Sequence, residues 1–217
     1  MRLLTNGAER AFNRPMRIIG GELKRRLIQG PPDAKTTRPI PDRVKEALFN
    51  MLRGHCEGAV VFDAFCGPGS IGIETLSRGA QRCVFVERDK KIAGILRQNI
   101  EALGVADRAD IAISDALGAG ALARCPHGAH LVFFDPPYAL MTDPARRARV
   151  LEQFGRCIER MDPEGYAVLR TPWPLRERDG GDRASVSLAV AGARGPETHE
   201  YGSMALLLYA PATHNGG

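Results

Sequence analysis

Short, mostly apolar runs, each followed within two residues by an acidic residue, are the feature that most limits the fold. The runs lie at 60–62, 83–86, 109–113 and 131–134, and the acidic residues that follow them are Asp63, Glu87, Asp115 and Asp135. Strands that are apolar throughout are typical of a parallel sheet covered by helices on both faces. The sequence therefore predicts an α/β fold with four carboxylates at the carboxyl ends of parallel strands, where such sheets bind ligands.

The remaining pattern predicts the other elements. Residues 16–29 are expected to form a β-hairpin, with Gly20 and Gly21 as a two-residue turn. Asp42 is expected to be the N-cap of a helix. Further strands are predicted at 166–170, 186–190 and 204–209, and further helices from the loop at 67–72 to about residue 78, at 89–103 and at 144–161. Residues 172–200, which are rich in Arg, Gly and Asp, could form a substrate loop or a plain connection, and the plain connection is favoured.

Charge is unevenly distributed along the chain. Residues 1–53 contain 12 Lys and Arg against 5 Asp and Glu, whereas the other residues contain 18 against 20. A basic segment on a near-neutral body fits a polyanionic partner such as nucleic acid, but a solvated surface has the same composition.

Other classes of protein are not indicated. No window reaches eighteen consecutive apolar residues, and the N-terminus lacks the apolar core of a signal peptide. The five cysteines include no CxxC pair, which argues against a disulfide framework or a zinc site. We therefore expect a cytoplasmic protein without a membrane segment or a metal.

Residues 67–72 read Gly-Pro-Gly-Ser-Ile-Gly, which matches G-x-G-x-x-G directly after a predicted strand. Glycines there let the backbone approach a ligand closely, and a helix N-terminus follows. Glu87 comes twenty residues after Gly67 and could accept both ribose hydroxyl protons. This context favours a nucleotide-type cofactor.

Two cofactors fit this loop, a nicotinamide dinucleotide and S-adenosylmethionine. A carboxylate at Asp63 would repel a pyrophosphate but can engage the ammonium group of a methionine moiety. Asp115 can accept a hydrogen bond from an adenine amino group. No partner for hydride transfer is identified, and S-adenosylmethionine is therefore favoured.

The fourth strand is followed by Asp135-Pro136-Pro137-Tyr138. The two prolines stiffen the backbone and fix the direction of nearby carbonyls. Asp135 and a main-chain carbonyl, that of Pro136, could accept the two hydrogens of an exocyclic base amine, while Tyr138 stacks on the flipped base. The motif therefore predicts methylation of a nucleobase amine, with catalysis by positioning and electrostatics.

The motifs occur together with two earlier segments. The two earlier segments are 16–21 (Met-Arg-Ile-Ile-Gly-Gly) and 37–50 (Thr-Arg-Pro-Ile-Pro-Asp-Arg-Val-Lys-Glu-Ala-Leu-Phe-Asn), and the motifs that follow them are 63–74, Glu87 and 135–138. In this order the chain resembles the bacterial 16S ribosomal RNA guanine-N2 methyltransferases that act on guanine 966, within the Rossmann-like S-adenosylmethionine-dependent enzymes. The resemblance covers roughly residues 16–209. It implies a seven-stranded, mostly parallel sheet with an antiparallel last strand, helices on both faces and an N-terminal hairpin.

The resemblance also implies site residues and domains. The implied cofactor-binding residues are Asp63, Phe65, Gly67, Gly69, Gly72, Glu87, Asp115 and Arg38. The implied catalytic residues are Asp135, Pro136 and Tyr138. The expected RNA-binding residues are Arg17, Lys24, Arg25, Arg26 and Arg43. The expected division is a flexible extension at 1–15, a basic hairpin and helix at 16–53, a catalytic domain at 54–211 and a disordered tail at 212–217.

The expected partner is 16S rRNA or the small ribosomal subunit, with a monomeric enzyme. A DNA or RNA adenine-N6 methyltransferase shares the Asp-Pro-Pro-Tyr chemistry, and a non-catalytic RNA-binding assembly factor could keep the same fold. A nicotinamide oxidoreductase is a third alternative.

Overall fold

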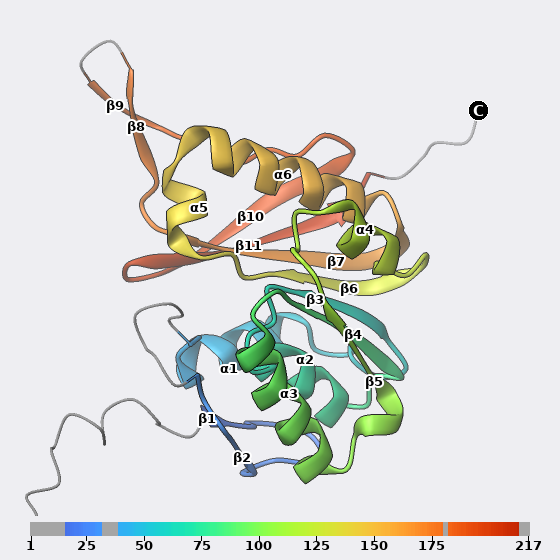
Figure 1. Ribbon diagram of the computed structural model, residues 1–217. Coiled ribbons are helices and arrows are strands. Elements are labelled where there is room, and N and C mark those ends of the chain that lie inside the picture. Colours follow the sequence, from blue (N-terminus) through green and yellow to red (C-terminus); the bar gives the residue numbers. More distant parts are fainter. Residues whose placement is uncertain (1–15, 32–38, 180–181, 213–217) are drawn as a thin grey trace, which may run out of the picture.

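A computed structural model of the chain describes residues 16–31, 39–179 and 182–212 (Figure 1). The predicted extension at 1–15, Arg38 and most of the predicted tail lie outside the described residues. The main sheet consists of β3 (Val60–Ala64), β4 (Arg82–Glu87), β5 (Ala109–Ile113), β6 (Ala129–Phe134), β7 (Met161–Pro172), β10 (Ala193–Tyr201) and β11 (Met204–Pro211). Two short hairpins are formed by β1 (Met16–Arg17) with β2 (Leu27–Ile28) and by β8 (Arg176–Asp179) with β9 (Asp182–Ser185).

The main sheet has the strand order β10-β11-β7-β6-β3-β4-β5. Strands β3 to β7 are parallel, and β11 is antiparallel to both of its neighbours, β7 and β10. The predicted seven-stranded, mostly parallel sheet with an antiparallel last strand is therefore confirmed. The first strand of this sheet, β3, lies between β4 and β6. Strands β4 and β5 are added on one side of β3, and β6 and β7 are added on the other, so the strand order changes direction between β3 and β6. In α/β folds ligands bind beside such a switch point.

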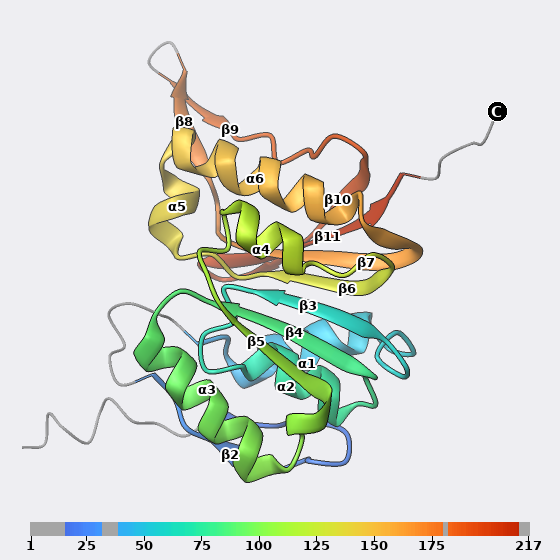
Figure 2. The same cartoon turned by 45° about the vertical axis from the view of Figure 1, so that its right-hand side comes forward.

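Helices cover both faces of the sheet, as predicted (Figures 1 and 2). One face carries α1 (Asp42–Met51), α2 (Ser70–Ser77) and α3 (Lys90–Leu103), and the other carries α4 (Ala119–Arg124), α5 (Tyr138–Thr142) and α6 (Pro144–Ile158). A 3-10 helix, Ala106–Arg108, precedes β5.

Alternate residues of the central strands face the two layers. On β4, Phe85 joins the hydrophobic core under α1 to α3, whereas Val84 and Val86 join the core under α4 to α6. The apolar runs in the sequence are continuous because both faces of these strands are buried.

The N-terminal hairpin packs against the first of these cores. Ile18 and Ile28 are 0% and 2% exposed and belong to the same apolar cluster as α1 and α2. The predicted two-residue turn is wrong, because Arg17 pairs with Leu27 and the connection between the two strands is longer. Gly20 is instead drawn toward α2, where its N–H donates to the buried Glu74 carboxylate over 2.7 Å.

The strand predicted at 186–190 is also wrong. This segment has no regular structure, although Leu188 and Val190 are buried. Tyr209 of β11 donates its hydroxyl hydrogen to the Leu188 carbonyl over 2.7 Å. The segment therefore packs on the sheet as an apolar cover, and its buried residues produced a false strand pattern.

One of the two edge strands of the sheet is β10, which lies in the region expected to be a plain connection; the other is β5. The residues of β10 are mostly exposed or half-buried and polar, and the strand pairs with β11 through a register shift between Arg194 and Glu197. An edge strand with one exposed face lacks the apolar run of a central strand.

Two helix ends differ from the prediction. The helix predicted at 144–161 ends at Ile158, and Asp42 is the first residue of α1, whose N-cap is Pro41.

No helix in the described ranges is long and apolar enough to cross a membrane.

Candidate active site

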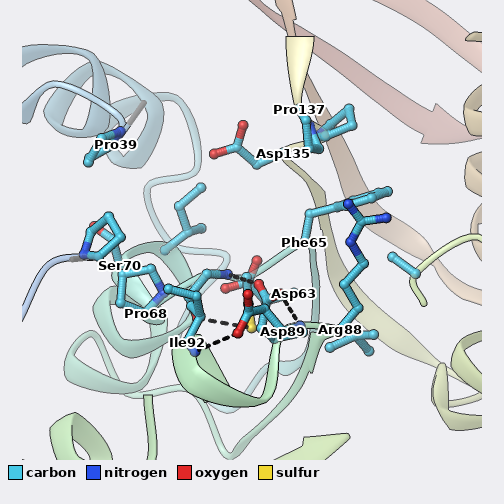
Figure 3. A pocket seen from close by; sticks show the side chains of 18 of the residues that line it. Pro39, Asp63, Phe65, Pro68, Ser70, Arg88, Asp89, Ile92, Asp135 and Pro137 are labelled. Carbon is cyan, nitrogen blue, oxygen red and sulfur yellow. Dashed lines mark hydrogen bonds between the residues drawn. The ribbon is translucent and has the colours of Figure 1, made fainter. Parts of the chain in front are cut away.

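A cavity of about 580 Å³ opens at the carboxyl ends of β3, β4 and β6 (Figure 3). It is lined by residues from three of the predicted motifs, including Asp63, Gly67, Glu87, Asp135 and Tyr138. Met16 and Pro39, which precede the sheet in the sequence, also border it. The structure therefore brings the glycine loop and the Asp-Pro-Pro-Tyr motif to one cavity, which lies where the strand order changes direction between β3 and β6.

The three glycines of the loop have different surroundings. Gly67 lines the cavity with φ +56°, and a Cβ at this position would meet no atom within 4 Å. At Gly69 a Cβ would lie 2.4 Å from Leu96, and at Gly72 it would lie 2.3 Å from Phe85. Gly67 thus leaves open the surface that a ligand can approach, whereas Gly69 and Gly72 allow the loop and α2 to pack closely on the fold.

Asp63 is the most deeply buried carboxylate of the cavity lining, with 1% of its surface exposed. Its Oδ2 accepts a hydrogen bond from the Gly72 backbone N–H over 2.9 Å, and its Oδ1 has no hydrogen-bond partner among the described residues. Burial raises the pKa of this carboxyl to about 8, with smaller contributions from Asp135 and Glu87. An unpartnered acceptor oxygen at a cavity wall fits a cationic ligand group.

Glu87 ends β4 and fixes the glycine loop from the neighbouring strand. Its Oε2 accepts from the Gly67 backbone N–H over 3.1 Å, and its Oε1 accepts from that of Asp89 over 2.8 Å. Each oxygen retains acceptor capacity, because a carboxylate has about four lone-pair positions. These bonds aim the carboxylate at the cavity, as the prediction of a ribose contact requires.

Phe65 lies between Asp63 and the glycine loop and has a left-handed backbone with φ +58°. Non-glycine residues adopt this conformation at an energetic cost and are concentrated at functional sites. The Phe65 ring packs edge-on against Phe134 with 5.7 Å between ring centroids. The strained turn thereby directs the chain from β3 into the glycine loop.

Asp135 faces the same cavity from the end of β6 (Figure 3). Arg170 of β7 donates from Nε to Asp135 Oδ1 over 2.5 Å, and the two side chains are 6% and 17% exposed. Burial raises the pKa of the Asp135 carboxyl, and the Arg170 guanidinium opposes that shift. Asp135 is therefore a largely buried carboxylate paired with an arginine, whereas no described residue forms an ion pair with Asp63.

The residues after Asp135 complete this wall of the cavity. Pro136, Pro137 and Tyr138 all line it, and α5 begins at Tyr138. The Arg170 guanidinium lies 5.9 Å from the centroid of the Tyr138 ring. Arg170 thus contacts Asp135 and Tyr138, the two side chains that are predicted to hold the target base.

Other predicted residues lie elsewhere. Gly69, Gly72 and Asp115 do not line the cavity, although Ser114 and Ala116 do. Asp115 is exposed, and its Oδ1 accepts from the Leu117 backbone N–H over 3.0 Å. Arg38 lies outside the described residues.

The predicted RNA-binding side chains are all exposed. They are Arg17, Lys24, Arg25, Arg26 and Arg43. Those of the hairpin occupy a segment anchored to α2 by Glu74, which is fully buried and also accepts from the Ile19 N–H over 2.8 Å. Lys45 is basic but buried, and it donates to the Arg17 carbonyl over 2.6 Å.

Sequence reasoning missed Arg170 as a site residue. A signal was present, because an arginine ends the apolar run Ala-Val-Leu-Arg in a strand expected to be buried. A buried arginine requires an anionic partner. Only the pairing of β6 with β7, in register from Leu131 with Tyr166 to Phe134 with Leu169, identifies that partner as Asp135.

The strand order, the antiparallel last strand, the glycine loop and the cavity beside it define a Rossmann-like methyltransferase fold. The chain belongs to the family described as Conserved hypothetical protein 95, whose model matches residues 16–160.

Similar proteins support this assignment. YlbH of Bacillus subtilis, whose name assigns it to the rRNA methyltransferases, is 39% identical over 124 residues, which are 57% of this chain and 67% of that protein. Ribosomal RNA small subunit methyltransferase D of Escherichia coli is 37% identical over 123 residues, which are 57% of this chain and 60% of that protein. The matched segments thus span about two thirds or less of these relatives. A solved structure described as the methyltransferase yhhF of Escherichia coli superposes with a TM-score of 0.70 at 26% identity and covers 91% of this chain and 98% of its own.

Proposed function

We propose that this protein transfers a methyl group from S-adenosylmethionine to the exocyclic N2 amine of a guanine in small-subunit ribosomal RNA. The observation that carries the proposal is the pair of carboxylates Asp63, which is buried, and Asp135, which is largely buried; they face one cavity from adjacent parallel strands. Among the described residues, one oxygen of Asp63 has no hydrogen-bond partner, whereas Asp135 is paired with Arg170. Two carboxylates in such different states suit two different ligands, a cationic cofactor and a neutral amine.

The cofactor half of the cavity consists of β3, the glycine loop and the end of β4. When bound, S-adenosylmethionine supplies a methyl group that is already activated by a sulfonium. In this proposal Asp63 Oδ1 accepts from the ammonium group, directly or through water, and Glu87 accepts from the ribose hydroxyls. Gly67 leaves its backbone open to close approach. The unpartnered Asp63 oxygen is the feature of the structure that fits this group.

The target half consists of the end of β6, the start of α5 and Arg170. Asp135 and the Pro136 carbonyl accept the two hydrogens of the amine, so that its lone pair is drawn out of conjugation with the ring. Tyr138 stacks on the flipped base. The nitrogen becomes acidic once it is methylated and loses its proton to water, so no strong general base is required.

The exposed basic residues of the hairpin and of α1 are proposed to contact RNA phosphates. Such contacts give affinity that is independent of sequence and weakens with salt. The names of the relatives support rRNA as the substrate. We expect the protein to act as a monomer in the cytoplasm, on 16S rRNA or the small subunit.

The direct test is to incubate the protein with methyl-labelled S-adenosylmethionine and either 30S subunits, naked 16S rRNA or DNA, and then to identify the labelled nucleoside. Label in N2-methylguanosine from ribosomal RNA is the expected result. Label in N6-methyladenosine would instead establish the adenine methyltransferase that shares the Asp-Pro-Pro-Tyr motif. No label in any substrate would favour a binding protein with the same fold.

A further inference from the structure

We propose that Arg170 is a positioning residue for the target base, which orients Asp135 as a hydrogen-bond acceptor and holds the Tyr138 ring in place for stacking. The inference rests on the proposed function, because it concerns the half of the cavity to which a base amine is assigned. It adds a residue of β7 that neither the glycine loop nor the Asp-Pro-Pro-Tyr motif contains.

The geometry of the ion pair carries the first part of this inference. The Arg170 Nε donates to Asp135 Oδ1, so the position of one oxygen of the carboxylate is fixed. The other oxygen, Oδ2, can accept a hydrogen from a ligand. The donors of a guanidinium form a rigid planar fork, whereas an ammonium rotates freely, so an arginine directs its Nε–H at Oδ1 better than a lysine would.

The second part follows from the position of the guanidinium relative to Tyr138. The distance of 5.9 Å from the guanidinium carbon to the ring centroid is within the range of a cation–π contact. Tyr138 is the first residue of α5 and directly follows two prolines, so the backbone that leads to Tyr138 is already restricted. One side chain therefore supports the acceptor of the amine and the ring on which the base stacks.

Burial makes the partner necessary for Asp135. The carboxyl lies among other acidic groups that face the cavity, namely Asp63 from β3 and Glu87 and Asp89 after β4, while Arg88 and Lys91 are exposed at its rim. Burial raises the pKa of Asp135, and Arg170 is the group that lowers it. A protonated Asp135 would present a donor where the amine needs an acceptor. Arg170 therefore extends the pH range in which Asp135 accepts.

The test compares wild type with Arg170→Gln and Arg170→Lys at a saturating concentration of S-adenosylmethionine, between about pH 5.5 and 9. An Arg176→Gln variant is a matched control, because Arg176 is exposed at the start of β8, after β7 ends. Methyl transfer to rRNA, the Kd for S-adenosylmethionine and thermal unfolding are measured for each.

We expect Arg170→Gln to lower kcat at pH 7 by tenfold or more and to move the acid limb of the kcat profile upward by roughly one to three pH units, the range typical of a lost opposite charge. Arg170→Lys should restore part of the acid limb, since it keeps the charge, but only part of kcat, since it loses the fork. The Kd for S-adenosylmethionine should stay within about twofold of wild type, and Arg176→Gln should match wild type throughout.

A drop in kcat of equal size at every pH, with an unmoved acid limb, would assign Arg170 a purely structural role and overturn the inference. Unchanged kinetics would overturn it as well. A wild-type protein that methylates no guanine contradicts the proposed function instead, and if it methylates another base the same pH comparison still decides the role of Arg170.

Discussion

Each half of the cavity contains an aspartate, buried at Asp63 and largely buried at Asp135, and the two halves differ in what surrounds it. Asp63, on β3, has one oxygen bonded to the Gly72 N–H and the other without a partner in the described structure. Asp135, on the adjacent strand, is paired with Arg170. A buried carboxylate without a counter-ion is stabilised when a cation binds, whereas one with a counter-ion can remain ionised next to a neutral ligand. This difference is the reason for proposing that the cationic ligand binds in the β3 half and the amine in the β6 half.

The change with the largest expected effect removes the acceptor in the β6 half. Asp135→Ala should lower methyl transfer by roughly 100- to 1,000-fold, the usual loss when one preorganised polar contact to a reacting group is deleted. The Kd for S-adenosylmethionine, measured by calorimetry, should be nearly unchanged, because the other half of the cavity is intact. Asp107→Ala, at an exposed position before β5, is the control. Full activity of Asp135→Ala would contradict the assigned role.

The corresponding change in the β3 half should have the opposite pattern. Asp63→Asn should weaken S-adenosylmethionine binding by roughly tenfold to 100-fold, since a charge-assisted contact is replaced by a neutral one. The same variant should be more stable near pH 7, because an amide, unlike a carboxyl whose pKa is raised to about 8, does not have to be protonated or buried as a charge on folding. A gain of about 1 kcal/mol would raise Tm by roughly 2 to 4 °C in a chain of this size. Loss of both binding and stability would mean that Asp63 is a structural residue.

The raised pKa of Asp63 has a consequence for stability. In the folded protein this pKa is about 8, compared with 3.8 for an ordinary Asp. Between these values the folded state holds more protons than the unfolded state, so this group lowers the free energy of unfolding as pH rises from about 4 to about 8. Comparing Tm against pH for wild type and Asp63→Asn isolates the contribution of Asp63 to stability. Parallel curves for the two proteins would contradict the raised pKa of Asp63.

The same titration should affect cofactor binding by a smaller factor. The ionised fraction of Asp63 increases as the pH rises toward about 8. The affinity for S-adenosylmethionine should therefore increase with pH, by at most about tenfold per pH unit between about pH 6 and 7.5. Above that range the ammonium group of the ligand loses its own proton, which limits the gain. The Asp63→Asn variant should lack the rise, and an identical rise in that variant would assign it to another group.

The smallest effect is expected outside both halves. Arg25→Ala combined with Arg26→Ala should weaken RNA binding several-fold and reduce the slope of log K against log salt by roughly 1.4, for two lost phosphate contacts on single-stranded RNA. The Kd for S-adenosylmethionine should not change. The matched control is Arg149→Ala with Arg156→Ala, two exposed arginines of α6 on the other face of the sheet. Equal RNA affinity of the hairpin variant and wild type at physiological salt would exclude these contacts.

The sequence was sufficient for those parts of the fold that are buried on both sides. The runs that became β3, β4 and β6 were recognisable because both of their faces are apolar, and Gly67, Glu87 and Asp135 were recognisable because they lie shortly after such runs. The polar edge strand β10 was missed and residues 186–190 were misassigned, since exposure and burial in that region do not follow a strand period. Arg170 was missed because its partner lies thirty-five residues away and is defined only by strand pairing. The different surroundings of Gly67, Gly69 and Gly72 likewise depend on which elements pack against each glycine in the folded chain.

The buried Glu74 limits how the hairpin can be exchanged between proteins. Its two oxygens accept from the N–H groups of Ile19 and Gly20, and Ser77 at the end of the same helix donates to the Gly20 carbonyl over 2.6 Å. Helix α2, which carries both side chains, starts directly after Gly69 of the glycine loop. A hairpin grafted without this helix would lose its acceptors, so the smallest transplantable unit extends from the hairpin through α2. The basic surface and the glycine loop are therefore inherited as one block.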